Sequence, residues 1–359
     1  MRLYFSTTFS VTRHCFSSSR ARTMSSLATG HVLPGGKWNY RILETVQGDK
    51  THTSTVYKAE IVSNKKSHDV PQWSFIKGAS QDNAIAMENL NRECQSYLLP
   101  GVASSTCFRK LYDVVDTSSE AAASDKYVAL EWLETTLAQV KYQSSQDTYV
   151  LAEKVLSAAL HSCVVLESHD HVNTDYKPAN ILLSGIGTSQ ITAKVGDLGL
   201  VFPSGQRFNA QPYAMRAPEV FLGYAYTKLS QVWAIAATLL CWIKPGILGV
   251  WDSPHYLINE AWSMAKIKRL FPHWRIPTPD EVEVDELKIA VEHAVNMSKE
   301  VPELLDILPL EQMMQAIEMP QGLRDLLRLM MVVDPSARPS ASSVLASRDF
   351  RGFQEYVSV

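Results

Sequence analysis

The sequence predicts an α+β protein in which a strand-rich N-terminal part precedes a mainly helical C-terminal part. Short apolar segments rich in Val, Ile, Tyr and Phe concentrate before residue 131, and that composition is typical of strands. Longer segments with apolar residues at helical spacing follow residue 144. Since 359 residues are enough to bury two separate cores, we expect two lobes.

The composition is that of an ordinary globular protein, with 46% hydrophobic and 20% charged residues. A formal net charge of −3 gives no reason to expect nucleic-acid binding. The longest apolar run, residues 232–243, is shorter than the about 20 residues that cross a bilayer and fits a buried helix. The five cysteines are scattered and lack a C-x-x-C pair, which argues against a disulfide framework or a zinc site. We expect an intracellular protein, cytoplasmic or nuclear.

The N-terminal segment has a different composition. Residues 1–43 contain no Asp or Glu, and four of their arginines are spaced through a Ser/Thr-rich stretch before Met24. Such a composition is typical of a mitochondrial transit peptide. A disordered tail, or a protein that begins at Met24, explains it equally well. We therefore predict a disordered or targeting segment over residues 1–36, which leaves a mitochondrial location open.

The strands are expected first along the chain. They are predicted at residues 40–44, 54–62, 73–77, 108–115 and 126–130. A helix is expected from about residue 83. The next long helix begins at Ser144-x-x-Asp147, which has the form of a capping box, and runs to about residue 167 with one apolar face.

A polar cluster follows that helix. Asp175-x-Lys-Pro-x-Asn180 leads into the apolar run 181–183, and Asp197 follows a second apolar run after a Gly/Ser-rich turn. Two short apolar runs joined by such a turn predict a β-hairpin. The hairpin would bring Asp175, Asn180 and Asp197 into one cleft. Their oxygen atoms suit a hard cation and a polyanionic substrate.

These residues carry a resemblance to the eukaryotic protein kinases. Asp175-Tyr-Lys-Pro-Ala-Asn180 resembles the kinase catalytic loop, and Asp197-Leu-Gly resembles the metal loop Asp-Phe-Gly. Ala-Pro-Glu219 is similar to a further kinase motif, and Arg338 matches the distal arginine that pairs with that glutamate. The resemblance implies a two-lobed protein-kinase-like fold, with an N-lobe over residues 37–133 and a C-lobe over residues 134–354.

The resemblance also implies roles in the C-lobe. Asp175 would accept the proton of a substrate hydroxyl, and Lys177 would neutralise charge on the transferring phosphoryl group. Asn180 and Asp197 would hold Mg²⁺.

In the N-lobe, Trp-Ser-Phe-Ile-Lys77 is similar to the kinase Val-Ala-Ile-Lys, whose lysine holds the phosphates of ATP. Glu93 is the predicted ion-pair partner of Lys77, with Glu88 as the alternative. The remaining predicted ATP contacts are two from the first strands and two from the interlobe hinge: Gly48, Val56, Glu131 and Leu133.

The sequence departs from the kinase pattern at several places. Only Gly48 stands where kinases have a glycine-rich loop, and Asn173 and Thr174 replace the His-Arg of the catalytic loop. Gln231 replaces the Asp that opens the next buried helix. The resemblance therefore implies an ATP- and Mg²⁺-dependent protein serine/threonine kinase, with a catalytically impaired pseudokinase scaffold as the alternative. A small-molecule kinase is a third interpretation, because fold does not fix substrate.

Residues 211–220 and the Asp-Leu-Gly variant most resemble the kinases of serine/arginine-rich splicing proteins. The long segment 251–320 lies where that group carries an insertion, and its acidic part, residues 280–303, could dock a basic protein substrate. A solvated helix is the alternative for this charge run.

We predict that activity does not depend on phosphorylation of the segment 199–216. Thr174 replaces the arginine that would pair with a phosphate there, and the hydroxyls of the segment are those of Ser204 and Tyr213. The double variant Ser204→Ala/Tyr213→Phe should keep its kinase activity in a phosphoryl-transfer assay. Activity that requires phosphate on either residue would contradict the prediction.

Overall fold

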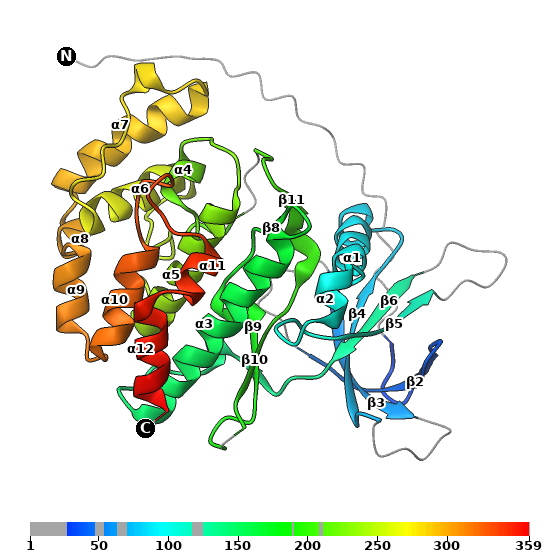
Figure 1. Cartoon of the computed structure of the whole chain (residues 1–359). Coiled ribbons are helices and arrows are strands. Elements are labelled where there is room, and N and C mark those ends of the chain that lie inside the picture. Colours follow the sequence, from blue (N-terminus) through cyan, green and yellow to red (C-terminus); the bar gives the residue numbers. More distant parts are fainter. Residues whose placement is uncertain are drawn as a thin grey trace, which may run out of the picture.

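The computed structural model describes residues 27–46, 54–62, 70–116, 125–188, 190–207 and 211–358. It confirms the predicted α+β fold, with a β-sheet lobe at the N-terminal side and a helical lobe at the C-terminal side (Figure 1). Each lobe has a hydrophobic core, and the core of the C-lobe continues under the helix of the N-lobe.

The N-lobe contains a six-stranded antiparallel sheet in the order β1-β2-β3-β4-β6-β5. Its strands are β1 (Val32–Pro34), β2 (Asn39–Thr45), β3 (Thr55–Val62), β4 (Trp73–Ala79), β5 (Leu111–Asp116) and β6 (Lys126–Glu131). Alternating residues bury one face, as in Tyr40 and Ile42 of β2 and Tyr57 and Ala59 of β3.

The predicted start of the N-lobe at residue 37 is too late. β1 pairs with β2, and Leu33 of β1 is buried opposite Tyr40. The backbone N–H of Leu27 also donates to the hydroxyl of Tyr57, at 3.1 Å. Residues 27–36 therefore belong to the folded lobe, because they complete the buried side of its sheet. Residues 1–26 lie outside the described residues.

Two helices lie in the described part of the N-lobe, α1 (Ala84–Tyr97) and α2 (Pro100–Ser104). The side chain of Asn83 caps α1 by accepting from the backbone N–H of Ala86, at 3.0 Å. Leu90 and Cys94 turn one face of α1 into the core, and Glu93 is buried on the neighbouring face.

The C-lobe is organised around α3 (Gln146–Glu167). Ser145 caps it by accepting from Thr148, whereas Ser144, the predicted cap, bonds to the hydroxyl of Tyr149. By length and composition α3 could cross a membrane, but 67% of its most apolar window is buried inside the lobe. It is a core helix.

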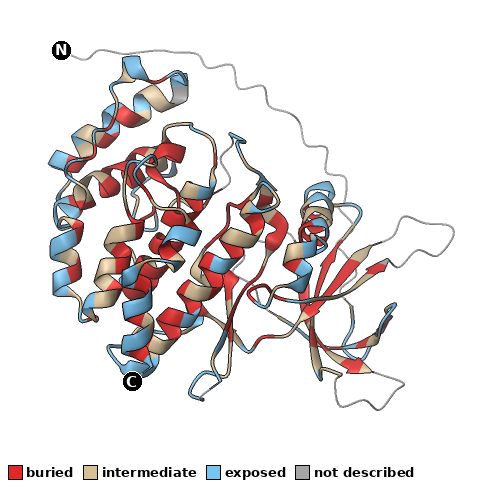
Figure 2. Cartoon of the chain, viewed as in Figure 1, coloured by how far each residue is buried: buried red, intermediate tan, exposed pale blue. Residues whose placement is uncertain are grey.

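The other helices surround α3 and the largely apolar α5, whose residues are nearly all buried (Figure 2). They are α4 (Pro218–Phe221), α5 (Lys228–Ile243), α6 (Asn259–Leu270), α7 (Asp285–Glu300), α8 (Pro302–Leu305), α9 (Leu310–Ala316), α10 (Gln321–Met330), α11 (Ala341–Leu345) and α12 (Arg348–Val357). Since α12 is helical to Val357 and buries that residue, the predicted C-lobe end at residue 354 is slightly early.

Short strands of the C-lobe lie against the sheet lobe. β9 (Ile181–Ser184) pairs antiparallel with β10 (Thr192–Val195), which confirms the predicted hairpin. β7 (Thr135–Thr136) joins the same sheet, and β8 (His171–Asn173) pairs with β11 (Val201–Pro203). Five 3₁₀ turns connect the described elements: η1 (Leu137–Gln139), η2 (Pro178–Asn180), η3 (Leu198–Leu200), η4 (Tyr256–Ile258) and η5 (Pro279–Glu281).

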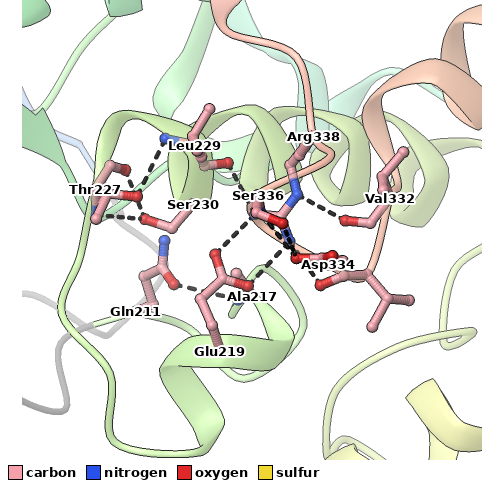
Figure 3. A network of polar contacts seen from close by, with 11 residues as sticks. Gln211, Ala217, Glu219, Thr227, Leu229, Ser230, Val332, Asp334, Ser336 and Arg338 are labelled. Atoms are coloured by element: carbon pink, nitrogen blue, oxygen red, sulfur yellow. Dashed lines mark hydrogen bonds and ion pairs between the residues drawn. The ribbon is translucent and has the colours of Figure 1, made fainter. Parts of the chain in front are cut away.

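A buried ion pair ties the C-terminal part of the lobe to its middle (Figure 3). Arg338 makes a bidentate contact with Glu219, at 2.7 and 2.9 Å. The same guanidinium donates to the carbonyls of Leu229 and Val332. The Arg338 side chain is fully buried, so its charge depends on these partners.

We predict that Arg338→Met destabilises the protein by roughly 3–5 kcal/mol, because it leaves the Glu219 carboxylate buried without its cation. Urea unfolding at neutral pH measures the loss. Arg328→Met is the control, since it breaks an exposed pair with Glu311 and should cost less than about 1 kcal/mol. Equal losses in the two variants would contradict the prediction.

Candidate active site

Lys77 stands at the centre of a cluster of three charges between the lobes. Its Nζ lies 2.7 Å from Oε2 of Glu93 on α1 and 3.0 Å from Oδ1 of Asp197 in the C-lobe. Glu88, the alternative partner, instead contacts Arg92 at 2.7 Å and is largely exposed. The structure therefore pairs Lys77 with Glu93.

Burial alone would lower the pKa of Lys77, but the carboxylates of Asp197 and Glu93 outweigh it and raise that pKa overall. Burial raises the pKa of Glu93, against the opposing effect of the Lys77 ammonium. Lys77 is consequently a permanent cation at neutral pH, held at a fixed point of the cleft.

The second group of site residues lies on the loop after β8. Asn180 Nδ2 donates to Oδ2 of Asp175 at 2.8 Å and to its backbone carbonyl at 2.9 Å. Lys177 Nζ lies 3.2 Å from the same carboxylate. Burial raises the pKa of Asp175, and the Lys177 ammonium opposes that rise. Proximity to a cation keeps this buried carboxylate available as a base.

Asn173 and Gln231 brace this loop in place of the His and Asp of the kinase pattern. The N–H of Asn173 donates to Oε1 of Gln231 at 2.8 Å, and Asn173 Oδ1 accepts from the N–H of Asp175 at 2.9 Å. Within the described part of the chain, the side-chain NH₂ groups of both amides are buried with no hydrogen-bond partner. The backbone support is present, yet each orphaned group costs about 1–3 kcal/mol.

Asp197 is placed by an uncommon backbone conformation. It follows β10 and caps η3 with φ 53° and ψ 75°, in the left-handed region. The preceding Gly196 donates its N–H to the carbonyl of Asn180, at 2.9 Å. Asn180 and Asp197, the predicted metal ligands, are thereby held on two adjoining segments. A left-handed conformation at a residue other than glycine, as at Asp197, is typical of functional sites.

A cavity of about 390 Å³ lies between the lobes. It is lined by several of the predicted residues: Val56, Lys77, Glu93, Leu133, Asn180 and Asp197. Asp175 and Lys177 lie beside Asn180. Gly48 lies outside the described residues.

Two side chains that the sequence analysis did not single out, Phe75 and Arg109, also line this cavity. Arg109 Nε donates to the backbone carbonyl of Glu131 in the hinge, at 2.7 Å. The Glu131 carboxylate accepts from Lys194, also at 2.7 Å. The backbone carbonyl of Glu131, a predicted ATP contact, thus already accepts a hydrogen bond from the protein itself. Phe75 could have been noticed, because it occupies the small Ala position of Val-Ala-Ile-Lys77.

Comparison with known families agrees with this geometry. The sequence model of the family described as protein kinase domain matches residues 53–350. The chain belongs to the protein kinase domain family. It is similar to the stress-activated protein kinase JNK of Drosophila melanogaster, with 29% identity over 132 residues, which is 34% of this chain and 33% of that protein.

The JNK of Suberites domuncula is 28% identical over 131 residues, which is 34% of both chains. These alignments thus span about a third of the length of the curated relatives. The family membership establishes the kinase fold, with a sheet N-lobe and a helical C-lobe.

We predict that Asp175→Asn raises stability more at pH 7 than at pH 4. The folded-state pKa of Asp175 is raised above its ordinary value of 3.8 by burial, so its ionisation opposes folding as pH rises through that interval. The neutral amide of the variant carries no such penalty. Thermal melting of both proteins at the two pH values measures the difference, with the exposed Asp82→Asn as control. A gain that is independent of pH would contradict the prediction.

Proposed function

We propose that this protein is an ATP- and Mg²⁺-dependent protein serine/threonine kinase. The observation that carries the proposal is the joint placement at one cleft of Lys77 and Glu93 from the N-lobe and of Asp175, Asn180 and Asp197 from the C-lobe. Kinase chemistry needs positioned charges for the phosphates, for the metal and for the substrate hydroxyl, and this arrangement supplies all three.

In this proposal Asp175 orients the substrate hydroxyl and accepts its proton. Lys177, at 3.2 Å from that carboxylate, balances negative charge beside it. Asn180 turns its NH₂ group toward Asp175, so its remaining side-chain oxygen and the Asp197 carboxylate are the donors that suit Mg²⁺. Bound Mg²⁺ would supply neutralisation of phosphate charge, and Lys77 would hold the phosphates.

The serine/threonine class and the substrate are finer parts of the proposal. The position of Lys177, two residues after Asp175, resembles the catalytic-loop pattern of the serine/threonine kinases. The likeness to kinases of serine/arginine-rich proteins rests on residues 211–220 and suggests a basic acceptor. The acidic residues near α7 support this in part, although Asp285 is paired with Lys288.

A pseudokinase scaffold is the second candidate, and two observations favour it. Arg109 occupies the hinge carbonyl of Glu131, where a kinase would bind the adenine. The orphaned amides of Asn173 and Gln231 point the same way, because they weaken the support of the catalytic loop.

Transfer of labelled γ-phosphate from ATP with Mg²⁺ to basic Ser/Arg-rich peptides, and to the protein itself, tests the proposal. We expect transfer by the wild type and a loss of at least about 100-fold in Asp175→Asn, because the general base is removed. Lys77→Met should lose comparable activity.

Glu88→Gln is the matched control, since this glutamate on α1 is exposed and pairs with Arg92 outside the cleft. It should keep wild-type transfer. Absence of transfer from the wild type to every acceptor, while the fold remains intact, would favour the pseudokinase scaffold.

A further inference from the structure

The cleft differs between its two ends. At the inner end, Lys77, Asn180 and Asp197 present the charges that a triphosphate and its metal require. At the hinge end, the wall is formed by Phe75 and Arg109, a large aromatic ring and a cation. Both residues belong to the N-lobe, Phe75 on β4 and Arg109 just before β5.

Arg109 is anchored by its backbone and directed to the hinge by its side chain. Its N–H donates to the carbonyl of Val195 at the end of β10, at 2.9 Å. Its Nε donates to the carbonyl of Glu131 at 2.7 Å, and the residue is only 8% exposed. A guanidinium is always charged and forms strong hydrogen bonds, so this contact is hard to displace.

Phe75 supports the guanidinium from the N-lobe. It lies two residues before Lys77 on β4 and so faces the same side of the strand, toward the cleft. The Cζ atom of Arg109 is 4.0 Å from the centroid of the Phe75 ring, which is a close cation–π contact.

Gly196 makes room on the C-lobe side. A Cβ at Gly196 would lie 2.5 Å from Leu182 Cδ1 and 3.7 Å from Arg109 Cδ. The missing side chain therefore leaves room for Leu182 at this end of the cleft, and the stem of Arg109 lies beside it. Three segments far apart in the sequence, at residues 75, 109 and 196, thus meet in the wall of one cavity.

We propose that this cleft selects its nucleotide by the triphosphate and the metal, and that Phe75 and Arg109 stand in place of base recognition. Arg109 already donates to the Glu131 carbonyl, and so takes up one of the two lone pairs that this acceptor could offer to the amine of adenine. The inference rests on the proposed function and names the nucleotide preference of the same cleft. It predicts a site that is indifferent to the base.

Equilibrium binding to the full chain in excess Mg²⁺ tests the proposal without any variant. The probes are ATP, GTP, UTP and inorganic tripolyphosphate. We expect the four dissociation constants to agree within about threefold, which is less than 1 kcal/mol. ATP bound at least about tenfold more tightly than both UTP and tripolyphosphate would overturn the proposal, because Arg109 would then yield its place to adenine.

Variants give the second arm. Arg109→Met keeps the length of the side chain but removes the donor, and Phe75→Val opens the wall. The double variant should gain at least about tenfold selectivity for ATP over UTP. Lys110→Met, at the neighbouring exposed position, is the matched control and should retain the wild-type pattern. Should the double variant not melt cooperatively, the wild-type series decides.

The outcomes separate this inference from the proposed function. Equal binding of all probes without phosphoryl transfer supports the inference and contradicts the proposed kinase activity. Strong preference for ATP together with transfer overturns the inference alone. No binding of any probe overturns both, because the Lys77 end of the cleft would then not hold phosphates.

Discussion

The contact between Lys77 and two carboxylates is the constraint on which the rest of the cleft depends. A buried ammonium is costly unless it is paired, and its partners here come from α1 in the N-lobe and from the segment before η3 in the C-lobe. Both α1 and the segment before η3 must therefore stay at a fixed distance from β4. Arg92 adds to the same junction, since its guanidinium donates to the carbonyl of Gly199 at 2.9 Å. One set of charges thus fixes the relative position of β4, α1 and η3.

A second junction lies at the hinge and uses different chemistry. Glu131 ends β6, and its carboxylate contacts Lys194 of β10 while its carbonyl accepts from Arg109. Arg109 is itself bonded to Val195, the residue after Lys194. The hinge is consequently held to the strand that leads to Asp197.

The sequence was sufficient for features that depend on neighbours along the chain. The β9–β10 hairpin follows from two apolar runs and a turn, and the order of Asp175, Asn180 and Asp197 follows from local motifs. The predictions that were wrong concern features that depend on contacts between distant parts of the chain, or on the choice between two neighbouring residues. β1 is only three residues long and is a strand because β2 offers it an edge, while Ser145 rather than Ser144 caps α3. The role of Arg109 could not be inferred, because its partners Phe75, Glu131 and Val195 are brought together by the fold alone.

The two ends of the cleft depend on different kinds of interaction, so their residues can vary independently. The phosphate end depends on charges that must remain paired, so replacing one of them leaves a buried charge unbalanced. The other end depends on packing: the Phe75 ring lies against the Arg109 guanidinium, and the missing side chain of Gly196 leaves room for Leu182. Side chains at this end of the cleft can therefore differ while Lys77, Glu93 and Asp197 keep their contacts. In our proposal, such a cleft would keep the charges that phosphoryl transfer needs and would draw its affinity for nucleotide from the phosphates.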